Sequence, residues 1–249
     1  MESSFEAAVA NLDEYLSNAS PKEDSFEWVI THLVARSLAD LKCGMYLAAR
    51  GYVVQMYSVM RPVRESMNLI HLFGRHQELI AEWKAGKHRK FTPKKVRDAL
   101  GIEEDRIYSW MSEHSHPRFA ASQVSMYPTG PATGVIVTGG LPRDHPQVLL
   151  AATMPADLLT EVAIAAGEIP MKPEAAILWP STVRSAIQRL IPGVESLFAA
   201  IQTSVIGFDA RPIAEQVLAV MQGNLASAEA LEAEVARKAR GSEPPGSGE

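Results

Sequence analysis

Apolar residues recur every three or four positions along most of the chain, which is the spacing of one face of an α-helix. The first such stripe covers residues 3–18, and a longer one covers residues 28–56. We expect Gly51 to interrupt the longer stripe, and we expect Pro62 to kink the helix or restart it. The N-terminal quarter of the chain is therefore predicted to be helical.

The helical pattern continues in shorter pieces up to residue 113. One piece extends from Val63 to a possible C-cap at Gly86. The next, over 92–101, has Thr92 as a candidate cap, a proline at the first helical position and a glycine at its end. A further helix is expected over about 103–113.

A different pattern appears at residues 122–145. The segments "QVSMY" and "GVIVTGG" are short and β-prone, and they predict either a small hairpin or an ordered loop. Helical spacing then returns in four stretches, with a break expected at Pro192 and Gly193. These stretches cover residues 146–168, 173–190, 194–207 and about 210–238.

The pattern as a whole predicts an all-α helical bundle with one irregular or hairpin insert. We expect a single domain over residues 1–238, whose C-terminal helices cover 146–238, and a flexible tail over 239–249. The final helix carries Val217 and Met221 on an apolar stripe. This stripe should either dock on the bundle or mediate association into a homodimer.

Composition narrows the class of protein. A chain of 249 residues with 47% hydrophobic and 21% charged residues is typical of a globular protein with a full core. The net charge of −5 argues against a broad nucleic-acid surface but leaves room for a local basic patch. The single Cys43 excludes an intrachain disulfide. We find neither a signal peptide nor a run of about 18 apolar residues, so we expect a cytoplasmic protein with no membrane contact.

A polar stripe lies on the predicted helix that follows residue 60. Arginine holds phosphate oxygens and histidine moves protons near neutral pH, so this stripe suits phosphodiester chemistry. The alternative is a solvated helix face with pairs such as Arg61 and Glu65. If the helix is central, the stripe must be paired or face a cleft. Its members are Arg61, Arg64, Glu65, Asn68, His71 and Arg75.

The stretch "YSWMSEHSHPRFA", residues 108–120, is the second candidate for a site. His114 and His116 flank one serine, and Arg118 follows. An extended His-x-His pair can ligate a metal, but no third ligand stands at a diagnostic spacing, so we predict no metal site. The alternative is that a histidine caps a helix by interacting with the free backbone carbonyl groups of its last turn.

Together these stretches resemble a group of bacterial helical proteins related to the HEPN superfamily. In that group a long helix carries an Arg-x-x-x-Glu pattern, here Arg61 and Glu65, and a later helix ends in Tyr-x-x-(Leu/Met)-Ser before a histidine, here beginning at Tyr108. The resemblance covers residues 28–120 and implies a HEPN-like core. The HEPN nuclease motif, an arginine and a histidine separated by four to six residues, is matched by Arg64 and His71. Glu65 stands where that motif usually has a small polar residue.

Two functions remain open from the sequence. The first is an RNA-binding or RNA-cleaving protein of stress or phage defence, which uses metal-independent Arg/His chemistry if it is catalytic and needs no cofactor. The catalytic candidates are then Arg64, His71, His114 and His116, and the binding candidates are Arg61, Glu65, Asn68 and Arg118. The second is a non-enzymatic interaction protein in which the same cluster is structural.

Overall fold

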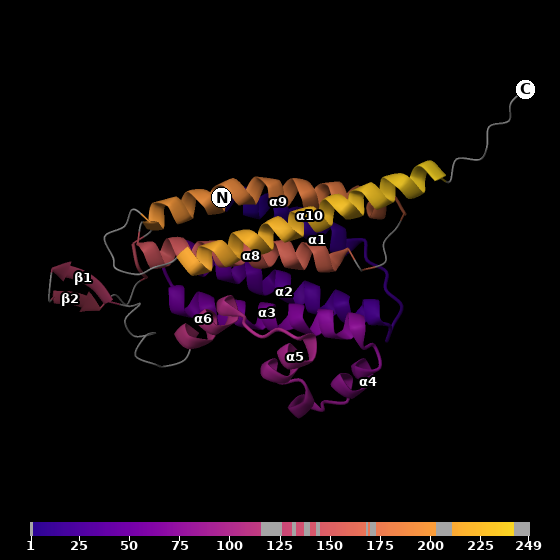
Figure 1. Cartoon of the computed structure of the whole chain (residues 1–249), viewed down its shortest axis with the longest axis horizontal. Helices are drawn as coiled ribbons and strands as arrows, with labels where there is room; N and C mark the ends of the chain where they lie inside the picture. Colours follow the sequence, from indigo (N-terminus) through magenta and orange to yellow (C-terminus); the bar gives the residue numbers. More distant parts are fainter. Residues whose placement is uncertain are drawn as a thin grey trace, which may run out of the picture.

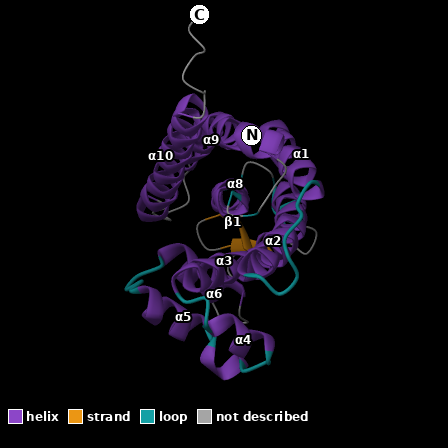
Figure 2. Cartoon of the chain, turned by 90° about the vertical axis from the view of Figure 1, so that its right-hand side faces the viewer, coloured by secondary structure: helices purple, strands orange, loops and turns teal. Residues whose placement is uncertain are grey.

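Six long helices form the body of the described part of the protein in the computed structural model. The structure describes residues 2–115, 126–130, 133–136, 140–142, 145–167, 169, 173–202 and 211–241. The six helices are α1 (Glu2–Ser17), α2 (Phe26–Ala49), α3 (Val53–Arg75), α8 (Pro146–Ala166), α9 (Pro173–Gln202) and α10 (Arg211–Gly241). In an end-on view, α8 lies at the centre and the other five surround it (Figure 2).

Smaller elements lie outside this ring. The short helices α4, η1, α5 and α6 lie on the α3 side of the bundle, and α6 also contacts α10 (Figure 1). Strands β1 and β2 pair antiparallel in a hairpin, within the insert expected at 122–145. The all-α prediction is therefore confirmed. The bounds are α4 (Leu79–Lys84), η1 (His88–Lys90), α5 (Pro93–Leu100), α6 (Arg106–Ser115), β1 (Met126–Gly130) and β2 (Thr133–Ile136).

The turn between α2 and α3 depends on a glycine. Gly51 has a φ of 73°, in the left-handed region, and its N–H donates to the Ala48 carbonyl at the end of α2. Its own carbonyl accepts a hydrogen bond from the Leu141 N–H (3.1 Å). A Cβ at Gly51 would collide with the Leu141 backbone, so this turn requires glycine for close approach as well as for conformation.

Prolines interrupt the helices less than the sequence suggests. The break expected at Pro192 and Gly193 is wrong, because α9 runs without interruption from Pro173 to Gln202. Likewise α3 continues through Pro62, and the real break lies at Gly51. An internal proline removes one hydrogen bond, and packing of both helices against α8 holds them together on either side of it.

The central position of α8 explains its composition. The stretch Gln147–Ala166 is long and apolar enough to cross a membrane by length and composition, contrary to the expectation that no such run exists. In the structure, 78% of this window is buried inside the bundle. A helix enclosed on every side has no polar face. The two acidic residues on α8, Asp157 and Glu161, therefore need an explanation.

The apolar stripe of α10 is also buried. Val217 and Met221 are fully buried, and Ile213 is nearly so. These residues lie where α10 packs on α8 and α9. Of the two roles expected for the stripe, docking on the bundle is the one that the fold uses. The helix continues beyond the expected end at 238 to Gly241.

Candidate functional site

The two motifs that carried the family resemblance meet where α6 packs on α3. The guanidinium of Arg61 lies 3.3 Å from the Glu65 carboxylate, and both side chains are less than one third exposed. The Tyr108 hydroxyl donates a 3.0 Å hydrogen bond to the same carboxylate. The Arg-x-x-x-Glu pattern and the tyrosine of the later helix are thus parts of one contact.

A fourth residue reaches this contact from α5. The guanidinium of Arg97 lies over the Tyr108 ring, with its carbon atom 4.1 Å from the ring centre. Burial, followed by the neighbouring Glu65 carboxylate, raises the pKa of Tyr108, so its hydroxyl stays a donor. We call Arg61, Glu65, Arg97 and Tyr108 the surface cluster. It joins α3, α5 and α6.

Beneath the surface cluster lies a second group built around Arg64. Its Nε atom donates to Asp105 Oδ2 (3.0 Å), and Nη1 donates to Glu161 of α8. The other oxygen of Asp105 accepts the Tyr108 backbone N–H (2.9 Å), which caps the first turn of α6. Burial opposes the charge of Arg64, but Glu161, Asp105 and Asp157 together raise its pKa and keep it protonated.

Asp157 completes what we call the buried charge cluster: Arg64, Asp105, Asp157 and Glu161. Its side chain is fully buried, and within the described part of the chain neither carboxyl oxygen has a hydrogen-bond partner. Burial, and then the charge of Glu161 one turn along α8, raises the pKa of Asp157 well above the usual range for a carboxyl group. Three carboxyl groups therefore share one arginine in a place that solvent scarcely reaches.

The two candidate histidines that the structure describes lie apart: His71 is on α3, and His114 is on α6, where it packs against Tyr57 of α3. The ring of His114 packs on Trp110 and Tyr57, and its Nδ1 donates to the Trp110 carbonyl (2.9 Å). Tyr57 precedes Arg64 by two helical turns, and the exposed His71 follows it by two turns. At 1.5 Å per residue, the two histidines are separated by about 20 Å along α3. His114 is buried beside Tyr57, which precedes Arg61 by one helical turn.

The other expected site residues divide between buried and undescribed positions. Asn68 is buried on α3. His116 and Arg118 lie outside the described residues. His114 does lie in the last turn of its helix, but its ring nitrogen bonds to a carbonyl inside the helix rather than to a free terminal one.

Sequence reasoning missed Asp105, Asp157, Glu161 and Arg97. One signal was available, because Asp157 and Glu161 are acidic residues four positions apart in an otherwise apolar helix, and such a pair must find partners inside a fold. No comparable signal marks Asp105, which lies in the acidic stretch "EED" with exposed neighbours. Among the described residues, no group of three His, Cys, Asp or Glu side chains could hold a metal ion.

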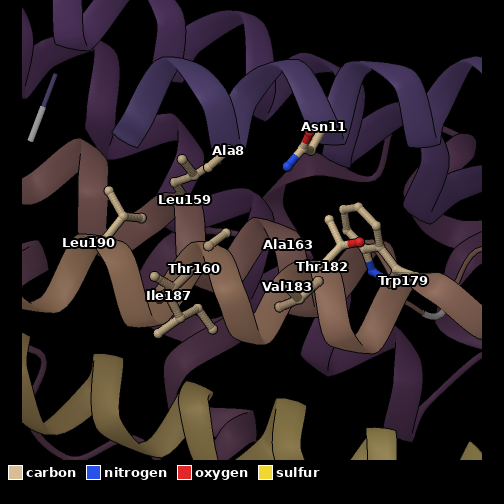
Figure 3. Close-up of a pocket in the computed structure, with 11 residues that line it drawn as sticks. Ala8, Asn11, Leu159, Thr160, Ala163, Trp179, Thr182, Val183, Ile187 and Leu190 are labelled. Carbon is tan, nitrogen blue, oxygen red and sulfur yellow. The ribbon is translucent and has the colours of Figure 1, made fainter. Parts of the chain in front are cut away.

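Three hollows in the described part of the structure lie between α1 and α9, away from both clusters. The seam itself encloses a volume of about 10 Å³ beneath Asn11, with Leu159, Val183 and Ile187 among its walls (Figure 3). That volume fits about one water molecule. Shallow hollows of about 210 and 250 Å³ adjoin it, near Arg189 and near Trp179. Neither cluster on α3 lines these spaces.

Comparison with known proteins adds no relative. No protein-family model, no curated protein and no solved structure matches the chain.

Proposed function

We propose that this protein binds RNA through a basic surface and does not cleave it. The observation that carries the proposal is the segregation of charge. Residues 79–100, which we call the basic lobe, contain seven lysines and arginines against two acidic residues, a net charge of +5 in a chain whose total is −5. The lobe consists of α4, η1 and α5, which lie outside the ring of long helices (Figure 1).

Part of this charge is compensated and part is not. Lys84 pairs with Asp24, and Lys87 and Lys90 both pair with Glu82. Three further cations, Arg89, Lys94 and Lys95, are exposed and have no carboxylate within ion-pair distance in the described part of the chain.

The position of these three cations favours a polyanion as the ligand of the basic lobe. The Lys95 ammonium donates to the Arg89 backbone carbonyl (2.9 Å), which holds η1 and the first turn of α5 together. Arg89 and Lys94 therefore project from a fixed scaffold. Cations that no carboxylate neutralises are the ones that exchange counterions for phosphate groups.

We exclude cleavage from the proposal because of the position of Arg64. An arginine that stabilises a reacting phosphate must reach it, but Arg64 is 13% exposed and bonds to two carboxylates. His71 lies two turns away from it. Metal-independent cleavage needs an acid or base within hydrogen-bond reach of the reacting group, and this pair does not provide one.

A charge-reversal experiment tests the binding. We expect the Arg89→Glu, Lys94→Glu variant to bind a fluorescent single-stranded RNA more weakly than wild type. The slope of log K against log salt should fall by about 0.7 for each phosphate contact that is lost. The matched control is Arg36→Glu, Arg237→Glu, which changes the net charge equally at exposed positions of α2 and α10. Equal affinity of both variants would contradict the proposal, and gel analysis of the same RNA should reveal no products.

The buried charge cluster also favours a second candidate function. A closed cluster of paired charges suits a non-enzymatic interaction protein in which Arg64 fixes the packing of α3, α6 and α8. If wild type fails to bind single-stranded RNA, duplex RNA and DNA at about 50 mM salt, where phosphate contacts are strong, this alternative replaces the first.

A further inference from the structure

The buried charge cluster contains more acid than its one arginine can neutralise. Asp105 uses both carboxyl oxygens, one for Arg64 and one for the cap of α6. Glu161 accepts the remaining arginine contact. No described residue forms a hydrogen bond with the Asp157 carboxyl group, although it is buried completely. An ionised carboxylate in that position would be costly, and it would face the charge of Glu161 as well.

We propose that Asp157 holds a proton at neutral pH, and that this proton makes the joint between α3, α6 and α8 sensitive to alkali. The two residues are one helical turn apart and share Arg64 as a neighbour. Because Glu161 is paired with Arg64, its negative charge opposes ionisation of Asp157, which has no such partner among the described residues. This inference is independent of RNA binding.

The charged groups that act on Asp157 come from three elements. Arg64 belongs to α3, Asp105 precedes α6, and Glu161 lies on α8 itself. The contact that α10 makes beside it is neutral, because the Asn224 amide donates to the Thr160 hydroxyl (2.7 Å). Within the described residues, the proton therefore depends on the balance between one arginine and two other carboxylates.

Loss of the proton has a consequence beyond α8. A second anion beside Glu161 draws Arg64 toward α8 and away from Asp105. Asp105 caps α6, and α6 carries Tyr108, on which Arg97 of α5 stacks. We therefore expect alkaline pH to loosen the first turn of α6 and its contact with α5 before the long helices separate.

The effect on stability follows from proton linkage. Between the ordinary carboxyl pKa and the raised pKa of Asp157, the folded state binds one proton more than the unfolded state. The unfolding constant of wild type should therefore rise up to tenfold per pH unit in that window, and it should stop rising above the raised pKa. In the Asp157→Asn variant no such proton exists, and this contribution to the slope should vanish.

The test uses the full chain and follows urea unfolding from about pH 5 to pH 10. Asp98→Asn, an exposed aspartate on α5, is the control and should keep the wild-type slope. Glu161→Gln should also flatten the slope, which keeps the test open if Asp157→Asn does not fold. The infrared band of a protonated carboxylic acid should be present at pH 7 in wild type and missing in Asp157→Asn. Equal slopes in wild type and both cluster variants, or no such band in wild type, would overturn the proposal.

Hydrogen exchange tests the link to α6. The Tyr108 backbone N–H donates a hydrogen bond to Asp105. In wild type, its protection from exchange should fall faster with rising pH than the protection of amides in the middle of α2, after correction for intrinsic exchange. This extra loss should be absent in Asp157→Asn. Equal behaviour of the Tyr108 amide in both proteins would show that the proton does not control α6.

Discussion

Replacing Arg64 with methionine should be among the most destabilising single changes on α3. Methionine keeps much of the apolar stem of the side chain but removes the only cation of the buried charge cluster. Asp105 and Glu161 then lose their ion pairs. Their side chains are only 1% and 9% exposed, respectively. Breaking a buried pair from one side costs about 3–5 kcal/mol, because it leaves uncompensated charge inside the fold.

Arg61→Met provides a matched control one turn away. The pair between Arg61 and Glu65 is 30% and 28% exposed, and exposed pairs contribute about 0–1 kcal/mol. Urea unfolding at pH 7 should therefore separate the two variants by at least about 2 kcal/mol in the free energy of unfolding. A loss in Arg64→Met no larger than that in Arg61→Met would refute the view that the cluster depends on its arginine.

The stability of Arg64→Met should depend on pH more strongly than the stability of Arg61→Met. Without Arg64, the carboxyl groups of the cluster must take up protons to remain buried. The folded state then binds more protons than the unfolded state, so the deficit of Arg64→Met should shrink as pH falls from 7 to about 5. The deficit of Arg61→Met should change little, because solvent reaches that pair. A deficit in Arg64→Met that grows in acid would contradict this account.

Three further substitutions test the packing. Tyr108→Phe removes the hydroxyl that binds Glu65 and should cost about 1 kcal/mol in urea unfolding; no change would show that this bond adds no stability. Gly51→Ala should lower the melting temperature far more than Gly101→Ala, because both have φ of 73° but only Gly51 lacks space for a Cβ; equal losses would contradict this. Val217→Asp should lower the melting temperature without changing the mass in light scattering, and a lower mass would instead indicate an interface between copies.

The helices were predictable from the sequence because each depends on local rules. Apolar spacing marks the faces that pack on α8, and Ser25 caps α2 through its hydroxyl (3.1 Å). Gly101 ends α5 in the left-handed conformation that its position suggested. Thr92 occupies the expected cap position of α5, yet its side chain makes no capping bond. Residue type thus located the helix start correctly without fixing how its N–H groups are satisfied.

The candidate site was only partly predictable, because its two layers depend on tertiary packing. Arg64 and Glu65 are adjacent in the sequence, but Arg64 turns toward α8 and Glu65 toward Tyr108. The partners of Arg64 lie 41 and 97 residues away. Helical spacing placed His71 on the same face as Arg64. The polarity of both stretches led us to expect His114 or His116 near the Arg61–Glu65 turn, and His114 packs beside Tyr57, one turn before Arg61.

Burial distinguishes the arginine of the candidate nuclease motif from the cations of the basic lobe. An arginine in an open cleft is available to phosphate, whereas Arg64 is neutralised by carboxylates that cannot leave it without being stranded in the core. Arg89 and Lys94 meet the opposite condition, since they are exposed and unpaired by any described carboxylate. The charge of Arg64 therefore holds helices together, whereas the charges of Arg89 and Lys94 are accessible to a ligand. A polyanion that binds at the lobe would stay on the surface, and this arrangement favours binding over cleavage.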